Sequence, residues 1–192
     1  MNGDINRPEF LLKTYLYDNN IHKTPLNLAC GKLIQTYWDN VDLFEFEQKR
    51  IRFNTNFIQQ DLFKDNWNLK DNHYDYIYCS HFFEHIPTAD IFFTIMKNIH
   101  RIAKNHCVLD IRVPYPKVTS FIDVTHCRLI DLKTFKFWMG TNTFSSYRAN
   151  ERVHMLSLIK RVPYGQYHIQ KYLKLSIPPY YGLRLVFDII KE

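Results

Sequence analysis

The stretch YDYIYCSHFFEHI, residues 74–86, admits two incompatible interpretations. Its second half contains the pattern H-x-x-E-H of one class of zinc peptidases, formed by His81, Glu84 and His85. In such a peptidase these residues lie on a continuous helix. Residues 74–79, however, alternate tyrosines with apolar residues as a strand does, and Pro87 disfavours helix at the preceding position. We therefore predict a buried strand with a polar exit, and no metal site.

Other short apolar runs flank this stretch and are bounded by turn-forming residues. They are residues 26–30, 40–44, 56–60, 107–113, 155–162 and 183–190. Residues 91–103 have the helical i, i+3, i+4 apolar spacing, with Thr88 or Asp90 as a candidate N-cap, and residues 8–20 suggest a second helix. Short, nearly continuous apolar strands with helices between some of them predict an open, mostly parallel α/β sheet.

The composition is that of one folded domain. The chain has 192 residues, of which 46% are hydrophobic and 16% aromatic. Nothing approaches a membrane-spanning run, and the N-terminal residues lack the apolar core of a signal peptide, so we expect a cytoplasmic protein without a membrane partner. The four cysteines form no C-x-x-C pair and are expected to be reduced and mostly buried. The net charge of +6 is scattered, which is only weak support for nucleic acid as a partner.

Polar residues and a glycine gather where the predicted strands end. They are Gly31, Asp42, Asp61 and the group His81, Glu84 and His85. In open parallel sheets, ligands bind beyond the carboxyl ends of the strands. These residues therefore predict a ligand site at that edge of the sheet.

The ordered series of motifs resembles the class I S-adenosylmethionine-dependent methyltransferases, and within them a small Methyltransferase-11-like branch with LNLGCG and NVD motifs. The matching stretches are LNLACGK (26–32), NVD (40–42), QQDLF (59–63), residues 74–86, IHRIAKNHCVLDIRVP (99–114) and DVTHCRLIDLKTF (123–135). The resemblance implies a Rossmann-like, open, mostly parallel twisted sheet with an antiparallel last strand and helices on both faces. It implies one domain over residues 1–192, with an N-terminal helical segment (1–23), a cofactor-binding core (24–138) and C-terminal strands (139–192).

The resemblance also implies which residues hold S-adenosylmethionine. Gly31 matches the central glycine, Asp42 the acid that binds the ribose hydroxyls, and Asp61 the acid that faces the adenine amino group. Around them, Leu62 and Phe63 would pack on the adenine ring, and Ser80 and His81 would face the methionine part. The full set of expected cofactor contacts is Asn27, Ala29, Gly31, Asp42, Asp61, Leu62, Ser80 and His81.

Methyl transfer depends mainly on aligning the acceptor with the methyl group, and a base helps when the acceptor must lose a proton. The candidate bases are His81 and His126, ahead of His85. Asp123 or Glu84 would orient the imidazole. We expect a small-molecule or saccharide acceptor, with RNA as a less favoured alternative.

The glycine-rich loop departs from the family pattern. Asn27 stands at the usual acidic position, and Ala29 and Leu33 replace glycines. Only ten residues separate Gly31 from Asp42, too few for a full helix and a strand, so the first crossover helix is predicted to be a stub. A degenerate protein that keeps the fold without binding cofactor, and acts as a binding or regulatory partner, therefore stays open.

Overall fold

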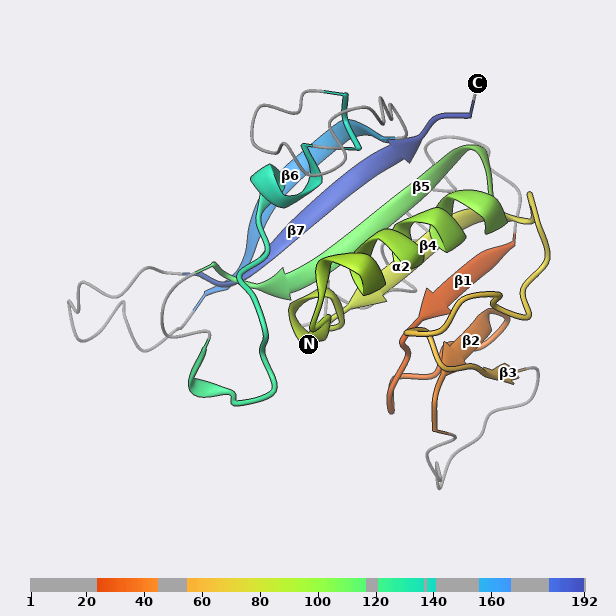
Figure 1. Ribbon diagram of the computed structural model, residues 1–192, viewed down its shortest axis with the longest axis horizontal. Coiled ribbons are helices and arrows are strands. Elements are labelled where there is room, and N and C mark those ends of the chain that lie inside the picture. Colours follow the sequence, from red (N-terminus) through yellow and green to blue (C-terminus); the bar gives the residue numbers. More distant parts are fainter. Residues whose placement is uncertain are drawn as a thin grey trace, which may run out of the picture.

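The computed structural model describes residues 24–44, 55–116, 121–136, 138–140, 156–166 and 180–191. These residues contain one seven-stranded sheet with the strand order β3-β2-β1-β4-β5-β7-β6 (Figure 1). The strands are β1 (Pro25–Leu28), β2 (Asp39–Asp42), β3 (Asn56–Gln59), β4 (Tyr74–Ser80), β5 (Ala103–Pro114), β6 (Leu156–Gln166) and β7 (Tyr180–Ile189). All seven predicted strands are confirmed, with ends that shift by a few residues.

The strand directions place one antiparallel strand within an otherwise parallel sheet. Strands β3, β2, β1, β4 and β5 pair in parallel, and β7 runs antiparallel to both β5 and β6. At the centre, Leu28 pairs with Val41 on one side and Cys79 on the other. The carboxyl ends of β1, β2 and β4 therefore meet at one edge, as predicted, and the last strand is antiparallel.

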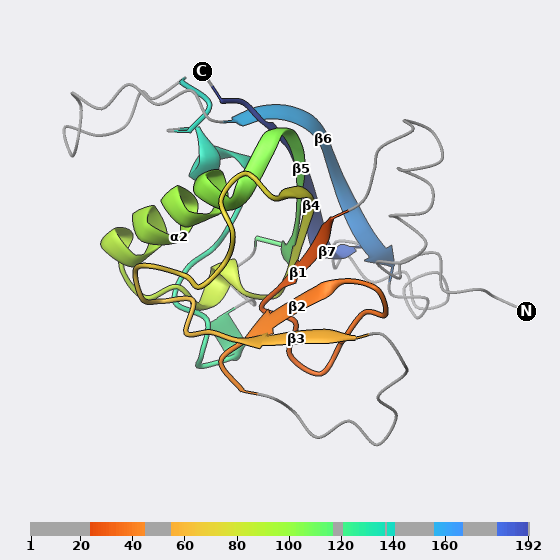
Figure 2. The same cartoon turned by 90° about the vertical axis from the view of Figure 1, so that its right-hand side faces the viewer.

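Helix α2 (Ala89–Ile102) covers one face of the sheet (Figures 1 and 2). The Thr88 hydroxyl caps it by accepting from the Ile91 amide, which satisfies a backbone donor left open at the helix start. Its apolar side packs on the sheet through Phe92, Ile95, Met96, Ile99 and Ile102. The predicted helix at 8–20 lies outside the described residues. Within the described residues, α2 packs on one face of the sheet.

The opposite face of the sheet carries a smaller buried cluster with polar members. Trp38, Tyr76, Tyr78, Val108 and Val186 are all buried there. The Trp38 and Tyr76 rings meet edge to face with centroids 5.7 Å apart. Successive side chains of β4 and β5 point to opposite faces of the sheet, and both faces are buried. This agrees with the continuous apolar runs in the sequence.

Asp110, on this second face, is fully buried and lies at the centre of a hydrogen-bonded group. It accepts from the Tyr76 hydroxyl at 2.7 Å and from Arg184 Nε and Nη2 at 2.9 and 2.8 Å. Burial, and then the Asp110 charge, raise the pKa of Tyr76 well above its usual range, so the phenol stays a donor. These side-chain hydrogen bonds join β4, β5 and β7, in addition to the backbone pairing of the same strands.

The connection from β1 to β2 contains turns and no helix, which confirms the predicted shortness of this crossover. Two buried amides organise it. Asn27 donates to the Leu33 carbonyl at 2.7 Å and to Asn40 Oδ1 at 3.0 Å. Asn40 in turn accepts from the Gln35 amide and donates to the Gln35 and Trp38 carbonyls. Side-chain amides thus satisfy backbone groups that a helix would otherwise pair.

No helix in the described part of the chain is both long and apolar enough to cross a membrane.

Candidate active site

Gly31 and Asp42 meet at the carboxyl edge of the sheet. The Gly31 amide donates to Asp42 Oδ2 at 2.8 Å, and the Leu43 amide donates to Asp42 Oδ1 at 2.7 Å. Gly31 has φ +52°, in the left-handed region that glycine adopts without steric cost. The turn after β1 is therefore fixed to the acid at the end of β2, as expected for two halves of one ligand site.

Ala29 also adopts a left-handed conformation, with φ +54°. Replacing the family's glycine with alanine would be harmless at a negative φ, but here the Cβ is strained. Leu33, at the other altered glycine, is 63% exposed and contributes its carbonyl to Asn27. Asn27 itself is 2% exposed and is used within the crossover, so it serves the loop's structure and is a poor candidate for ligand contact.

The strain at Ala29 gives a stability prediction. Ala29→Gly is expected to raise the free energy of unfolding by roughly 0.5–1 kcal/mol, the steric cost at positive φ less the extra entropy of glycine. Urea unfolding measures the change. Ala103→Gly is the matched control, because Ala103 has φ −69° and gains no relief, so it is expected to lose stability. Loss of stability in Ala29→Gly as well would contradict the assigned strain.

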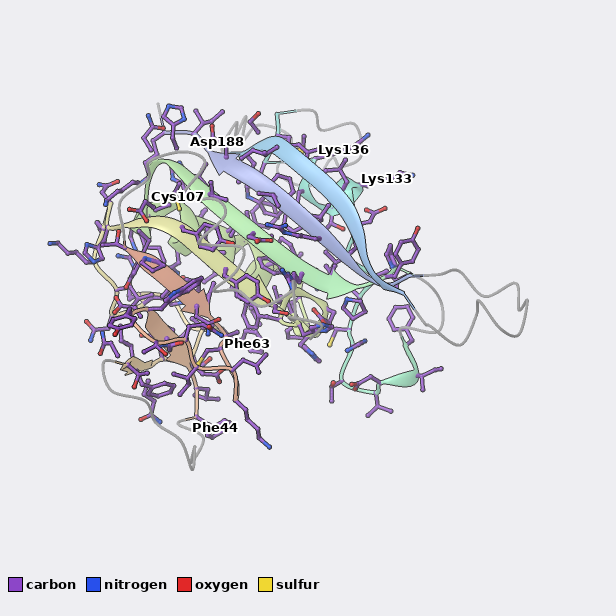
Figure 3. The ribbon with its side chains drawn as sticks, turned by 180° about the vertical axis from the view of Figure 1, so that it is seen from behind. Phe44, Phe63, Cys107, Lys133, Lys136 and Asp188 are labelled. Carbon is purple, nitrogen blue, oxygen red and sulfur yellow. The ribbon has the colours of Figure 1, made fainter. Side chains whose placement is uncertain are left out.

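Asp61 and the aromatic residues near it form the next part of the edge. Asp61 Oδ1 accepts from the Phe63 amide at 2.9 Å, which orders the turn after β3. Of the two residues predicted to pack on the adenine ring, Leu62 is buried in the core, whereas Phe63 is accessible. Phe63 is 36% exposed and stacks on Phe82 with centroids 5.8 Å apart. Figure 3 shows Phe63 and the exposed Phe44 on the same side of the molecule.

His81 leaves β4 with φ +54°, directly after Ser80. Its amide donates to the Arg112 carbonyl at 2.8 Å, and its Nδ1 lies 3.1 Å from Glu84 Oε1. Glu84 is 2% exposed, whereas the His81 side chain is 50% exposed. The buried carboxylate therefore orients an imidazole that remains accessible at the strand end, as predicted for a histidine–carboxylate pair.

The segment after β5 is held against the η1 turn (Phe83–His85), a short 3-10 helix. The Cys127 and Arg128 amides both donate to the Glu84 carbonyl, at 2.7 and 3.3 Å. This attachment brings His126 to His85, with ring centroids 4.9 Å apart. Residues 83–85 form one turn and no α-helix, which confirms that the zinc-peptidase helix is absent from this stretch.

His126 and Asp123 form the second predicted histidine–carboxylate pair. His126 Nε2 lies 3.7 Å from Asp123 Oδ2, and only 11% of the His126 side chain is exposed. The Thr125 hydroxyl and amide both donate to Asp123 Oδ1, at 2.6 and 2.9 Å. These hydrogen bonds, followed by the nearby imidazoles, lower the pKa of Asp123, so the side chain stays ionised beside His126.

Arg128 is a residue of this segment that we did not predict from the sequence. Its guanidinium lies over the Phe92 ring, 5.5 Å from the centroid, and burial lowers its pKa. Its Nε is buried and has no hydrogen-bond partner among the described residues. The sequence does place Arg128 in the DVTHCRLID stretch, which also contains the predicted residues Asp123 and His126.

Superposition on solved structures identifies the fold. A methyltransferase of Archaeoglobus fulgidus superposes with a TM-score of 0.61 at 17% identity, covering 93% of each chain. The methyltransferase domain of a bacterial Hen1 protein (TM-score 0.57, 13% identity) covers 93% of this chain and 95% of its own. A methyltransferase of Mesorhizobium loti (0.53, 13%) covers 97% and 100%. The chain has the class I methyltransferase fold.

No protein-family model and no curated protein sequence matches the chain. The methyltransferase fold thus rests on the structural likeness, which extends over nearly all of each chain. In this fold the carboxyl edge of the sheet holds Asp61, Asp42, Gly31 and His81, at the ends of β3, β2, β1 and β4. Their individual roles toward a ligand stay predictions.

Proposed function

We propose that the chain is an S-adenosylmethionine-dependent methyltransferase. The observation that carries this proposal is the hydrogen bond from the Gly31 amide to Asp42 Oδ2, within a sheet of methyltransferase topology. It joins the glycine turn of β1 to the acid of β2, the two elements that would bind the methionine part and the ribose. The fold alone would not require these two residues to be present or in contact.

The described residues fit the parts of the cofactor. Each Asp42 oxygen accepts one amide and keeps a second lone pair, so the carboxylate can also accept from ribose hydroxyls. Asp61 Oδ1 is used by the Phe63 amide, and the same carboxylate can accept from the adenine amino group. The exposed, stacked Phe63 offers an apolar face to the adenine ring.

When bound, S-adenosylmethionine would supply a methyl group on a sulfonium, and transfer would form a bond from the acceptor atom to the methyl carbon while the carbon–sulfur bond breaks. The chain's own contribution is alignment and removal of a proton. The proposed bases that take this proton are His81, whose Nδ1 lies 3.1 Å from Glu84 Oε1, and His126, beside ionised Asp123.

A small molecule or a saccharide is the proposed acceptor class, and the histidine bases suit an acceptor group, such as a hydroxyl, that must lose its proton. RNA is the less favoured acceptor. The degenerate alternative, a binding or regulatory protein of this fold without catalysis, is favoured by one observation: the strained Ala29 at a position where the family keeps glycine. Titration with the cofactor separates the enzyme from this degenerate alternative.

Calorimetric titration with S-adenosylmethionine and S-adenosylhomocysteine tests the proposal. Wild type is expected to bind both, and Asp42→Ala to bind about 10- to 100-fold more weakly, since hydrogen bonds to a charged group contribute about 1.5–3 kcal/mol. Asp65→Ala, which removes an exposed acid from the loop after β3, is the control and should bind as wild type does.

Urea unfolding of each variant confirms that weaker binding does not reflect loss of fold. Absence of heat in wild type would refute the enzyme proposal and leave the degenerate alternative. Equal affinity in wild type and Asp42→Ala would refute the assignment of Asp42 to the ribose.

A further inference from the structure

Two histidines and a buried glutamate come together from segments 40 residues apart in the sequence. One carboxylate oxygen of Glu84 and one ring nitrogen each of His85 and His126 lie within 4.8 Å of one another. We propose that this Glu–His–His cluster binds a divalent transition-metal ion. We predicted no metal site from the sequence, because the peptidase motif requires a continuous helix. The motif itself gives no sign that His126 joins Glu84 and His85 in the fold.

The Glu84 carboxylate provides independent support. Glu84 is 2% exposed, and its Oε2 is buried without a hydrogen-bond partner among the described residues. A carboxylate oxygen that is desolvated and unpaired is costly, and a bound cation is one of the few groups that compensates for it. The other oxygen, Oε1, is held by His81 Nδ1 at 3.1 Å, which fixes the orientation of the carboxylate.

The hydrogen bond of His85 leaves a nitrogen ready for coordination. Its Nδ1 lies 3.1 Å from the Thr125 carbonyl oxygen. A carbonyl can only accept, so Nδ1 carries a proton here, and Nε2 is the ring nitrogen with a lone pair available to a metal. Histidines that bind metals typically donate their other N–H to a carbonyl or carboxylate in this way, which orients the ring.

The backbone fixes the two halves of the cluster. The Glu84 carbonyl accepts from the Cys127 and Arg128 amides, so the residues next to His126 are attached to the turn that carries Glu84 and His85. Metal–ligand bonds of roughly 2.0–2.2 Å require ligand atoms somewhat closer than 4.8 Å, a difference that small side-chain rotations can close.

Two imidazoles and a carboxylate favour a first-row transition metal such as zinc, iron or manganese over calcium, which prefers oxygen ligands. Three protein ligands leave at least one coordination position for an exchangeable group, the arrangement of catalytic rather than structural sites. If the proposed methyltransferase function holds, that position would receive an oxygen-bearing acceptor, and His81 would be the remaining base, because His126 would be bound to the metal.

Cobalt(II) titration of the full chain, purified without a polyhistidine tag, tests the site without cofactor or activity. Visible d–d absorption should appear and saturate at one ion per chain, and zinc should displace the cobalt. His126→Gln and His85→Gln should each weaken binding by at least about 10-fold, as loss of a metal ligand or its support does. Having two variants guards against one that fails to fold.

Two controls complete the experiment. His106→Gln removes an exposed histidine on β5 whose Nδ1 contacts Asp188 Oδ2, and should leave cobalt affinity unchanged. Cys127→Ser should do the same, because the exposed Cys127 is not a proposed ligand. Failure of wild type to bind cobalt stoichiometrically, unchanged affinity in both folded histidine variants, or loss of binding in Cys127→Ser would overturn the proposal. Since no cofactor is added, each outcome is independent of the calorimetric test of methyltransferase function.

Discussion

Replacing Asp110 with alanine is expected to lower the free energy of unfolding by about 3–5 kcal/mol, because it leaves the half-buried Arg184 guanidinium without its counter-charge. The fully buried carboxylate accepts two hydrogen bonds from Arg184 and one from Tyr76. Removing it also takes away the hydrogen bond that the buried Tyr76 hydroxyl donates to Asp110. Urea unfolding followed by fluorescence or circular dichroism measures the loss.

The matched control for this prediction is the exposed pair of Arg101 and Asp71, in which the Asp71 side chain is 63% exposed. Asp71→Ala should cost no more than about 1 kcal/mol, because surface ion pairs contribute little. The double variant Asp110→Leu/Arg184→Met should be more stable than Asp110→Ala, since it leaves no unpaired charge. A cost below about 1 kcal/mol in Asp110→Ala would mean that the group does not stabilise the second face.

Phe135→Ala is expected to destabilise the protein by about 3–5 kcal/mol, the range found when a large aromatic is removed from a core. Phe135 is fully buried at the end of the short η3 helix (Leu132–Phe135), and its ring lies 5.0–6.4 Å from those of four neighbours. These neighbours are Phe83, Phe92, Trp138 and Phe187. The ring therefore joins the segment after β5 to η1, α2 and β7.

Chemical unfolding also measures this change. Phe121→Ala serves as the control, because Phe121 lies in the same segment but is 45% exposed, and its loss should cost about 0.5 kcal/mol or less. Phe135→Leu, which keeps much of the apolar volume, should recover part of the stability. Equal stability of Phe135→Ala and Phe121→Ala would show that the aromatic cluster does not anchor the segment.

Most of the sheet could be predicted because its strands are buried on both faces. Such strands have nearly continuous apolar sequences, bounded here by Gly31, Pro87 and Pro114. The shortness of the first crossover followed from chain length alone. What the sequence could not show is how that crossover is stabilised, since the Asn27–Asn40 contact depends on two strands pairing in register.

The parts of the candidate site that lie directly after a strand could be predicted from the sequence. The parts formed by contact between two distant segments could not. Gly31, Asp42 and His81 lie at strand ends, as their positions in the sequence indicated. The positive φ of Ala29 and the burial of Leu62 are properties of the folded backbone that a motif does not encode. The approach of His126 to Glu84 and His85 depends on backbone hydrogen bonds between distant segments, so the cluster had no local pattern.

The position of β7 between β5 and β6 has a consequence for synthesis on the ribosome. Residues 180–189 leave the ribosome after every other strand, yet they pair with both of these neighbours and supply Arg184 to Asp110. A nascent chain that lacks them exposes the long edge of β5 and a buried acid without its cation, a state prone to mispairing. The sheet can therefore close only once residues 180–189 have been translated.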